Sequence, residues 1–252
     1  MPLYERGQVR IHYEDTGSGF PLLILPGGGL NATIAFGRRM PFDAASEFSG
    51  EFRCIVADLR NANGGESSGP LEVDRPWDSY ADDQLGLLDH LGVDRFMAIG
   101  FCIGGPFIGN LLRLAGERVV AGVVAQPVGF RPEKPTVMTD HSMDDWGPAL
   151  LKRPDVSDEM VQAFLKNMWG TSDFLFTVTR DFIRTCETPL LVLPDDTDAH
   201  PLAVAMETGE LAPNGQISLY PWKERPEQIP LAVRHVRMFL QAHLPVASNS
   251  AS

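Results

Sequence analysis

Short, wholly apolar runs recur along the chain, separated by longer segments of mixed polarity. Such runs are typical of strands buried on both faces, because neither side of the strand meets water. The run Pro21–Leu25 (PLLIL) is an example, whereas Val9–Glu14 (VRIHYE) alternates in polarity as an edge strand does. We predict strands at Val9–Glu14, Pro21–Leu25, Phe52–Ala57, Arg95–Gly100, Val119–Ala125, Leu190–Leu193 and Ile217–Tyr220.

Helical periodicity fills most of the segments between these strands. In Ser79–Leu91 apolar residues recur at helical spacing, and Gly92 follows as a stop signal. The same pattern predicts helices at Ile103–Leu114 and Pro201–Leu211 and from Ile229 to Leu240. Strands that alternate with helices predict an α/β fold, in which a mainly parallel sheet is covered on both faces.

One interval breaks this alternation. Residues 127–188 are rich in proline and methionine and contain no clear strand, with helical stretches near Asp158–Met168 and Asp173–Arg184. We interpret this interval as a helical cap inserted over the site, while residues 1–126 and 189–245 form the core. The polar tail Val246–Ser252 is predicted to be disordered.

The amino-acid composition limits the kinds of partner and the compartment that the protein can have. The formal net charge of −12 disfavours nucleic acid and anionic membranes, and no apolar stretch is long enough to span a bilayer. The N-terminus lacks the layout of a signal peptide. Three cysteines are an odd number, which fits free thiols in a reducing compartment better than a disulfide framework. We therefore expect a cytoplasmic protein with a small-molecule substrate, and a homodimer remains open.

The segment Gly100–Gly105 (GFCIGG) carries the strongest chemical signal. It joins a predicted strand to a predicted helix. One glycine lies two residues before Cys102 and another lies two residues after it. This is the pattern of a nucleophile elbow, a turn so tight that its central side chain projects outward. A helix N-terminus also favours a thiolate. The alternative is that Cys102 is a small buried core residue.

Other polar loops follow the ends of predicted strands, where sites lie in parallel sheets. The run Pro26-Gly27-Gly28-Gly29 can expose backbone N–H groups to a substrate, or it can be a flexible turn. The turn Asp58-Leu59-Arg60 is interpreted as structural. The loop Pro194–Pro201 is acidic and contains His200.

These motifs together resemble those of the α/β-hydrolase superfamily over nearly the whole chain. The resemblance rests on Leu25–Gly29, on Asp58-Leu59-Arg60, on the elbow and on Pro189–Asp196. The elbow itself is similar to that of dienelactone hydrolases, Gly-x-Cys-x-Gly-Gly. The resemblance implies an α/β-hydrolase fold without a cofactor, Cys102 as nucleophile, and an oxyanion hole made by the N–H groups of Gly28 and Ile103.

The chain departs from the superfamily pattern at the residue that serves as general base. The superfamily places its histidine in the loop after the last strand, and here that loop, Tyr220–Pro226, contains none. We hypothesise that His200 has taken over as base, since imidazole carries protons near neutral pH; a helix-capping or structural role is the alternative. Asp198 matches the superfamily acid best by its spacing, and Asp196 is the other candidate.

The substrate pocket is expected to include Gly29, Asn31, Phe101 and Trp146. Asn31 could instead cap a helix, and Trp146 could belong to the core of the cap. No metal site is expected, because the acidic loop has too few well-spaced nitrogen or sulfur ligands.

Three functions remain open at this point. The leading one is a cofactor-free hydrolase of a small ester, thioester or lactone through Cys102. The second keeps the fold without the usual histidine and uses the pocket for ligand binding, acyl transfer or a lyase-type reaction. The third is a non-catalytic interaction module.

Overall fold

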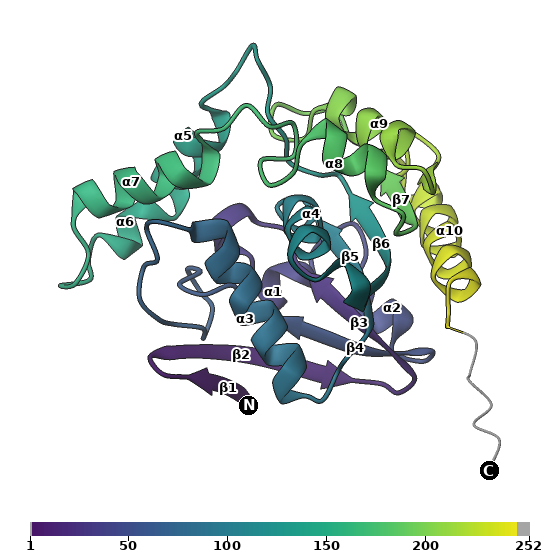
Figure 1. Ribbon diagram of the computed structural model, residues 1–252, viewed down its shortest axis with the longest axis horizontal. Helices are drawn as coiled ribbons and strands as arrows, with labels where there is room; N and C mark the ends of the chain where they lie inside the picture. The colour runs from purple at the N-terminus through teal and green to yellow at the C-terminus, as the bar shows by residue number, and fades with distance from the viewer. Residues whose placement is uncertain (1, 246–252) are drawn as a thin grey trace.

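An eight-stranded sheet organises the molecule, shown in Figure 1 as a computed structural model in which residues 2–245 are described. The order is β1-β2-β4-β3-β5-β6-β7-β8. The first two strands pair antiparallel and β2 joins β4 in the same way, while all remaining pairs are parallel. The strands are β1 Leu3–Arg6, β2 Val9–Thr16, β3 Phe20–Leu25, β4 Phe52–Ala57, β5 Phe96–Phe101, β6 Val119–Ala125, β7 Leu190–Leu193 and β8 Gly215–Ile217.

Helices cover both faces of the sheet and leave two buried apolar clusters. One cluster joins the sheet to α3, α4 and α9, and the other joins it to α2 and α10. The α-helices are α1 Ile34–Gly37, α2 Ala44–Phe48, α3 Pro76–His90, α4 Gly104–Ala115, α5 Val137–Asp145, α6 Gly147–Leu150, α7 Asp158–Trp169, α8 Arg180–Thr185, α9 Leu202–Leu211 and α10 Ile229–Ala242. The 3₁₀ turns are η1 Gly29–Asn31, η2 Gly116–Arg118 and η3 Pro226–Gln228. The predicted α/β architecture with a mostly parallel sheet is confirmed.

A few elements differ from the expected ones. Strand β1 was not predicted, and β8 begins and ends earlier than Ile217–Tyr220. The helix expected at Asp173–Arg184 is restricted to α8, because Thr179 caps its N-terminus by accepting a hydrogen bond from the N–H of Phe182. The tail 246–252 lies outside the described residues.

Helices α5, α6 and α7 form a group above the sheet in Figure 1, whereas α8 packs against α9. The end of α5 is tied to two loops at the strand ends. The side-chain amides of Asn31 and Asn63 both donate to the carbonyl of Asp145, at 3.3 and 2.8 Å. The indole of Trp146 donates to the carbonyl of Asn61 at 3.0 Å. These bonds hold α5 beside the C-terminal edge of the sheet.

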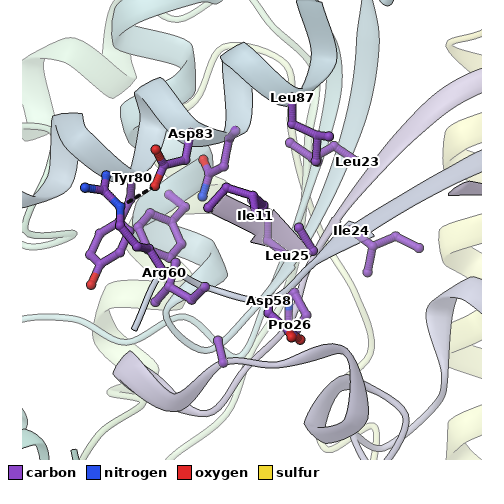
Figure 2. Close-up of a pocket in the computed structure, with 15 residues that line it drawn as sticks. Ile11, Leu23, Ile24, Leu25, Pro26, Asp58, Arg60, Tyr80, Asp83 and Leu87 are labelled. Carbon is purple, nitrogen blue, oxygen red and sulfur yellow. Dashed lines mark hydrogen bonds and ion pairs between the residues drawn. The ribbon is translucent and has the colours of Figure 1, made fainter. Parts of the chain in front are cut away.

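The Asp58-Leu59-Arg60 turn supports the fold through two buried networks. Asp58 accepts from the N–H groups of Ile34 and Glu66, both at 2.8 Å, and lies 3.0 Å from His12 Nδ1. Arg60 Nε donates to Asp83 Oδ2 at 2.7 Å beside a cavity of about 30 Å³ between α3 and the sheet (Figure 2). Burial raises the pKa of Asp83 to about 6, against the opposing effect of Arg60.

We expect Arg60→Met to lower the free energy of unfolding by about 3–5 kcal/mol at pH 7, because the buried Asp83 loses its hydrogen-bonded partner and keeps only the longer contact with Arg6, whose Nη2 lies 3.9 Å from Oδ1. Urea denaturation measures this loss. Arg75→Met is the matched control, since Arg75 pairs with Asp82 at the surface and such pairs contribute about 0–1 kcal/mol. Equal losses in the two variants would contradict a structural role for the Arg60–Asp83 pair.

Candidate active site

Cys102 stands at the turn between β5 and α4 with a left-handed backbone, φ 56°. Its N–H donates to the carbonyl of Ala125 at 3.0 Å. Its own carbonyl accepts from the N–H groups of Gly105 and Val128, both at 3.1 Å. These bonds fix a conformation that costs a non-glycine residue free energy, and such strain concentrates at functional sites.

The glycines on either side of Cys102 are needed because the backbone packs closely there. A Cβ atom at Gly100 would lie 2.4 Å from the carbonyl oxygen of Gly104. A Cβ atom at Gly104 would lie 2.8 Å from the carbonyl oxygen of Leu25. The turn therefore has the sterics of a nucleophile elbow, with α4 against β5 and β3.

The loop after β3 directs backbone N–H groups at the sulfur of Cys102. Gly28 and Gly29 both have positive φ, 116° and 56°, and their N–H groups stabilise the thiolate form. Successive N–H groups in such a turn form an anion-binding concavity. Ile103 is the N-cap residue of α4, where amides of the first turn lack helical acceptors. The N–H groups of Gly28 and Gly29 therefore lie near the thiol, while Ile103 follows Cys102 directly in the chain at the start of α4.

His200 lies beside Cys102 and is oriented by Asp195. Its Nδ1 is 3.0 Å from Asp195 Oδ2 and 3.1 Å from Thr197 Oγ1. Its Nε2 is buried without a partner in hydrogen-bond geometry, yet the thiol of Cys102 is close enough to shift the pKa of both groups. The structure therefore brings Cys102 and His200 together, and supplies a carboxylate behind the imidazole.

The charges of these three groups depend on one another. Burial alone would raise the pKa of Cys102, but His200 and the N–H groups of Gly28 and Gly29 lower it below its ordinary value. Burial would lower the pKa of His200, but Asp195 and Cys102 raise it to about 9. The pKa of Asp195 falls to about 2 despite burial, because His200 and Lys223 bind the carboxylate. Each group thereby favours the charged form of the other, the thiolate on Cys102 and the imidazolium on His200.

The carboxylate differs from the two expected ones. Asp196 and Asp198 are exposed, and Asp198 pairs with Lys134 and Arg131 away from His200. Asp195 comes directly after Pro194 at the end of β7. Its side chain is buried at the sheet edge, within hydrogen-bond distance of His200. Spacing from the strand favoured Asp198, but the loop turns its side chain toward solvent.

Lys223 and Gln126 are site residues that the sequence reasoning missed. Lys223 Nζ donates to Asp195 Oδ2 at 2.7 Å and to Gln126 Oε1 at 2.6 Å. Gln126 follows β6 with φ 43°, and Lys223 lies in the histidine-free loop after β8. Both follow a strand at its C-terminal end, a signal that could have pointed to them.

A cavity of about 650 Å³ opens onto Cys102, His200 and Lys223. Gly29, Asn31 and Trp146 are among the residues that line it. Phe101 does not, because its ring turns into the opposite layer of the sheet and packs edge-to-face on Phe42 with centroids 5.2 Å apart. The cavity is thus bounded by the glycine loop, the elbow and α5.

Residues 2–245 contain no cluster of three or more histidine, cysteine or carboxylate side chains that could hold a metal ion. None of the helices described is both long enough and apolar enough for a transmembrane span.

Known proteins share this architecture. Haloalkane dehalogenase 2 of Mycobacterium bovis and of Mycobacterium tuberculosis is 30% identical over 166 residues, 64% of this chain. That match covers 54% of the relative, so the chain spans about half the length of the curated relatives it matches.

Solved structures match over almost the full chain at low identity. A serine hydrolase from Cycloclasticus zankles, CCSP0084, is 17% identical with a TM-score of 0.70, covering 97% of this chain and 99% of its own. The enol-lactonase from Burkholderia xenovorans LB400 is 18% identical with a TM-score of 0.67, covering 95% and 100%. These similarities concern the fold.

The family model described as alpha/beta hydrolase fold matches residues 21–193, which is more than half of the chain and includes the glycine loop and the elbow. The order of strands, the turn at Cys102 and the position of the cavity agree with that match. The chain belongs to the α/β-hydrolase fold family.

Proposed function

We propose that this protein is a cofactor-free hydrolase of small esters, thioesters or lactones, with Cys102 as nucleophile, His200 as proton carrier and Asp195 as the carboxylate that orients His200. The observation that carries the proposal is that Cys102 and His200 line the same cavity, close enough for each to shift the pKa of the other, while Asp195 binds Nδ1 of His200. This replaces the superfamily histidine with one from the β7–α9 loop. The hydrolase relatives support the general reaction class.

Acylation begins from the thiolate–imidazolium pair. The Cys102 thiolate attacks the substrate carbonyl, and the N–H groups of Gly28, Gly29 and Ile103 lie where they can bind the negative oxygen. The carbon–oxygen bond to the leaving group then breaks. His200 gives its proton to the leaving alkoxide, which departs as an alcohol, and the acyl group remains on sulfur as a thioester.

Deacylation returns the enzyme to its starting state. A water molecule attacks the thioester carbonyl while neutral His200 takes its proton. The carbon–sulfur bond breaks and Cys102 leaves as a thiolate beside the imidazolium. The acid product loses its own proton to solvent. Asp195 stays ionised throughout, because its role is to hold the imidazole in one orientation.

The lining of the cavity suits a small, partly apolar acyl group. Met138 and Trp146 contribute apolar surface to it. Binding, acyl transfer and lyase-type reactions are the alternatives for the same pocket. They differ from hydrolysis in whether an acyl-enzyme forms and in whether water then hydrolyses that acyl-enzyme.

The test is to trap the acyl-enzyme. Wild-type protein is mixed with p-nitrophenyl acetate, quenched in acid within the first turnovers and analysed by intact-mass and peptide mass spectrometry. We expect one acetyl group on the peptide that contains Cys102, together with a burst of p-nitrophenol. Continuous release of p-nitrophenol without an acyl group on Cys102 would overturn the proposed mechanism. An acetyl group that forms but resists water would indicate acyl transfer instead.

A further inference from the structure

The carboxylate of Asp195 is shared between two nitrogen groups. Its Oδ2 lies 3.0 Å from His200 Nδ1 and 2.7 Å from Lys223 Nζ. The Asp195 side chain is 5% exposed and that of Lys223 is 22% exposed, so water screens the contact only in part. An ammonium on the same oxygen offsets the negative charge that would otherwise favour a protonated imidazole.

Lys223 is held at this oxygen by its surroundings. Its Nζ also donates to Gln126 Oε1, and the backbone N–H of Gln126 donates to the carbonyl of Leu193 at 2.7 Å. The neighbouring Trp222 is fully buried and donates its indole N–H to the carbonyl of Pro194 at 2.7 Å. The loop after β8 is therefore anchored to the end of β7 on both sides of the ion pair.

Other charged or titratable groups share the cavity with His200 but are not bonded to it. His141 and Asp145 of α5 lie 3.9 Å apart and are exposed, and Arg39 also lines the cavity. The groups that face the imidazole from the packed elements are Cys102 from the elbow, Asp195 and Thr197 from its own loop, and Lys223 from the loop after β8.

The charge needed on His200 changes during the proposed reaction. In the free enzyme the imidazolium is useful, because it stabilises the thiolate and protonates the leaving group. In the acyl-enzyme the thiolate has become a neutral thioester, while Asp195 still favours the imidazolium. A protonated imidazole cannot accept a proton from water, so a group that counters Asp195 raises the fraction of acyl-enzyme that can deacylate at a given pH.

We propose that Lys223 is a positioning residue that shares Asp195 with His200 and so keeps the imidazole neutral in the acyl-enzyme, ready to take a proton from water. The inference rests on the function proposed above and deepens it. It assigns a purpose to a lysine in the loop where the superfamily keeps its histidine. It also separates the two half-reactions, because Lys223 is needed for deacylation and not for formation of the thiolate.

The experiment measures deacylation directly in Lys223→Met. The acetyl-enzyme is formed with p-nitrophenyl acetate, transferred rapidly to buffers between pH 5 and 9, and followed by intact mass as the acetyl group is lost. We expect the midpoint of the acid limb to move up by about one pH unit, so that deacylation below it slows about tenfold. Alkylation of Cys102 at pH 6 should be unchanged or faster, a result that a merely structural role would not give.

Three companion variants make the result decisive. Lys223→Arg keeps the charge and should keep the wild-type midpoint. Lys223→Gln keeps a hydrogen-bond donor without the charge and should shift as Lys223→Met does; it carries the test if Lys223→Met does not fold. Lys134→Met removes an equal charge that pairs with exposed Asp198, and it should change nothing. An unshifted midpoint in folded Lys223→Met or Lys223→Gln would overturn the inference, whereas failure of wild-type protein to form an acetyl-enzyme would instead contradict the proposed function.

Discussion

Replacing Cys102 with alanine is expected to lower kcat/KM for p-nitrophenyl acetate by about 10⁴-fold or more. The variant keeps the backbone donors of Gly28, Gly29 and Ile103 but has no group to form the acyl-enzyme. Only the weak catalysis of an oxyanion hole acting on water would remain. Initial rates of p-nitrophenol release measure the loss.

The control for this substitution removes another thiol. Cys186 is buried at the end of α8 and does not line the cavity, so Cys186→Ala should keep kcat/KM within about twofold. The folded state of each variant is checked by thermal denaturation. If Cys102→Ala keeps more than about a tenth of the wild-type rate, water is activated without a thioester and the assignment of the nucleophile fails.

Replacing His200 with glutamine is expected to lower kcat/KM by about 10³-fold, within the range ascribed to general acid–base catalysis. Two effects act together. The thiolate of Cys102 loses the group that contributes most to its stabilisation, and the leaving group loses its proton donor. The rate of iodoacetamide alkylation of Cys102 at pH 6 should fall by about 10²-fold in the same variant, since the thiolate is the reactive form.

His141→Gln separates this effect from a general change in the cavity. His141 lines the same cavity, yet its ring is exposed and its neighbour is Asp145. We expect its alkylation rate and kcat/KM to stay within about threefold of wild type. Alkylation at pH 6 that is equally fast in His200→Gln and wild type would show that His200 does not hold the thiolate.

The sheet and the elbow were predictable because local physics specifies them. Buried parallel strands are continuous apolar runs, so β3 to β7 were found with small errors at their ends. The elbow was recognisable because Gly100 and Gly104 are required by direct backbone contacts, which leave no alternative residue. Strand β1 was missed because it is short and lies at the sheet edge, where its residues do not form an apolar run.

The site was predictable only in part, because its contacts join loops that are distant in sequence. His200 was identified from its place at the end of β7, but the direction of each carboxylate depends on how the loop turns. Asp195 turns inward and Asp198 outward, and spacing alone does not distinguish them. Lys223 reaches Asp195 only because the β8 loop is anchored to Pro194 through Trp222, a contact across 28 positions of the chain.

The pH dependence of Cys102 alkylation tests the central claim most directly, namely that Cys102 and His200 form a thiolate–imidazolium pair. Wild-type protein is treated with iodoacetamide between pH 4 and 10, and modification is followed on the Cys102 peptide so that Cys54 and Cys186 do not contribute. His200 and the N–H groups of Gly28 and Gly29 lower the pKa of Cys102, and the pKa of His200 is about 9, so we predict a rate that stays high below pH 8. A single rise with a midpoint near 8.5, the value of an ordinary thiol, would contradict the account.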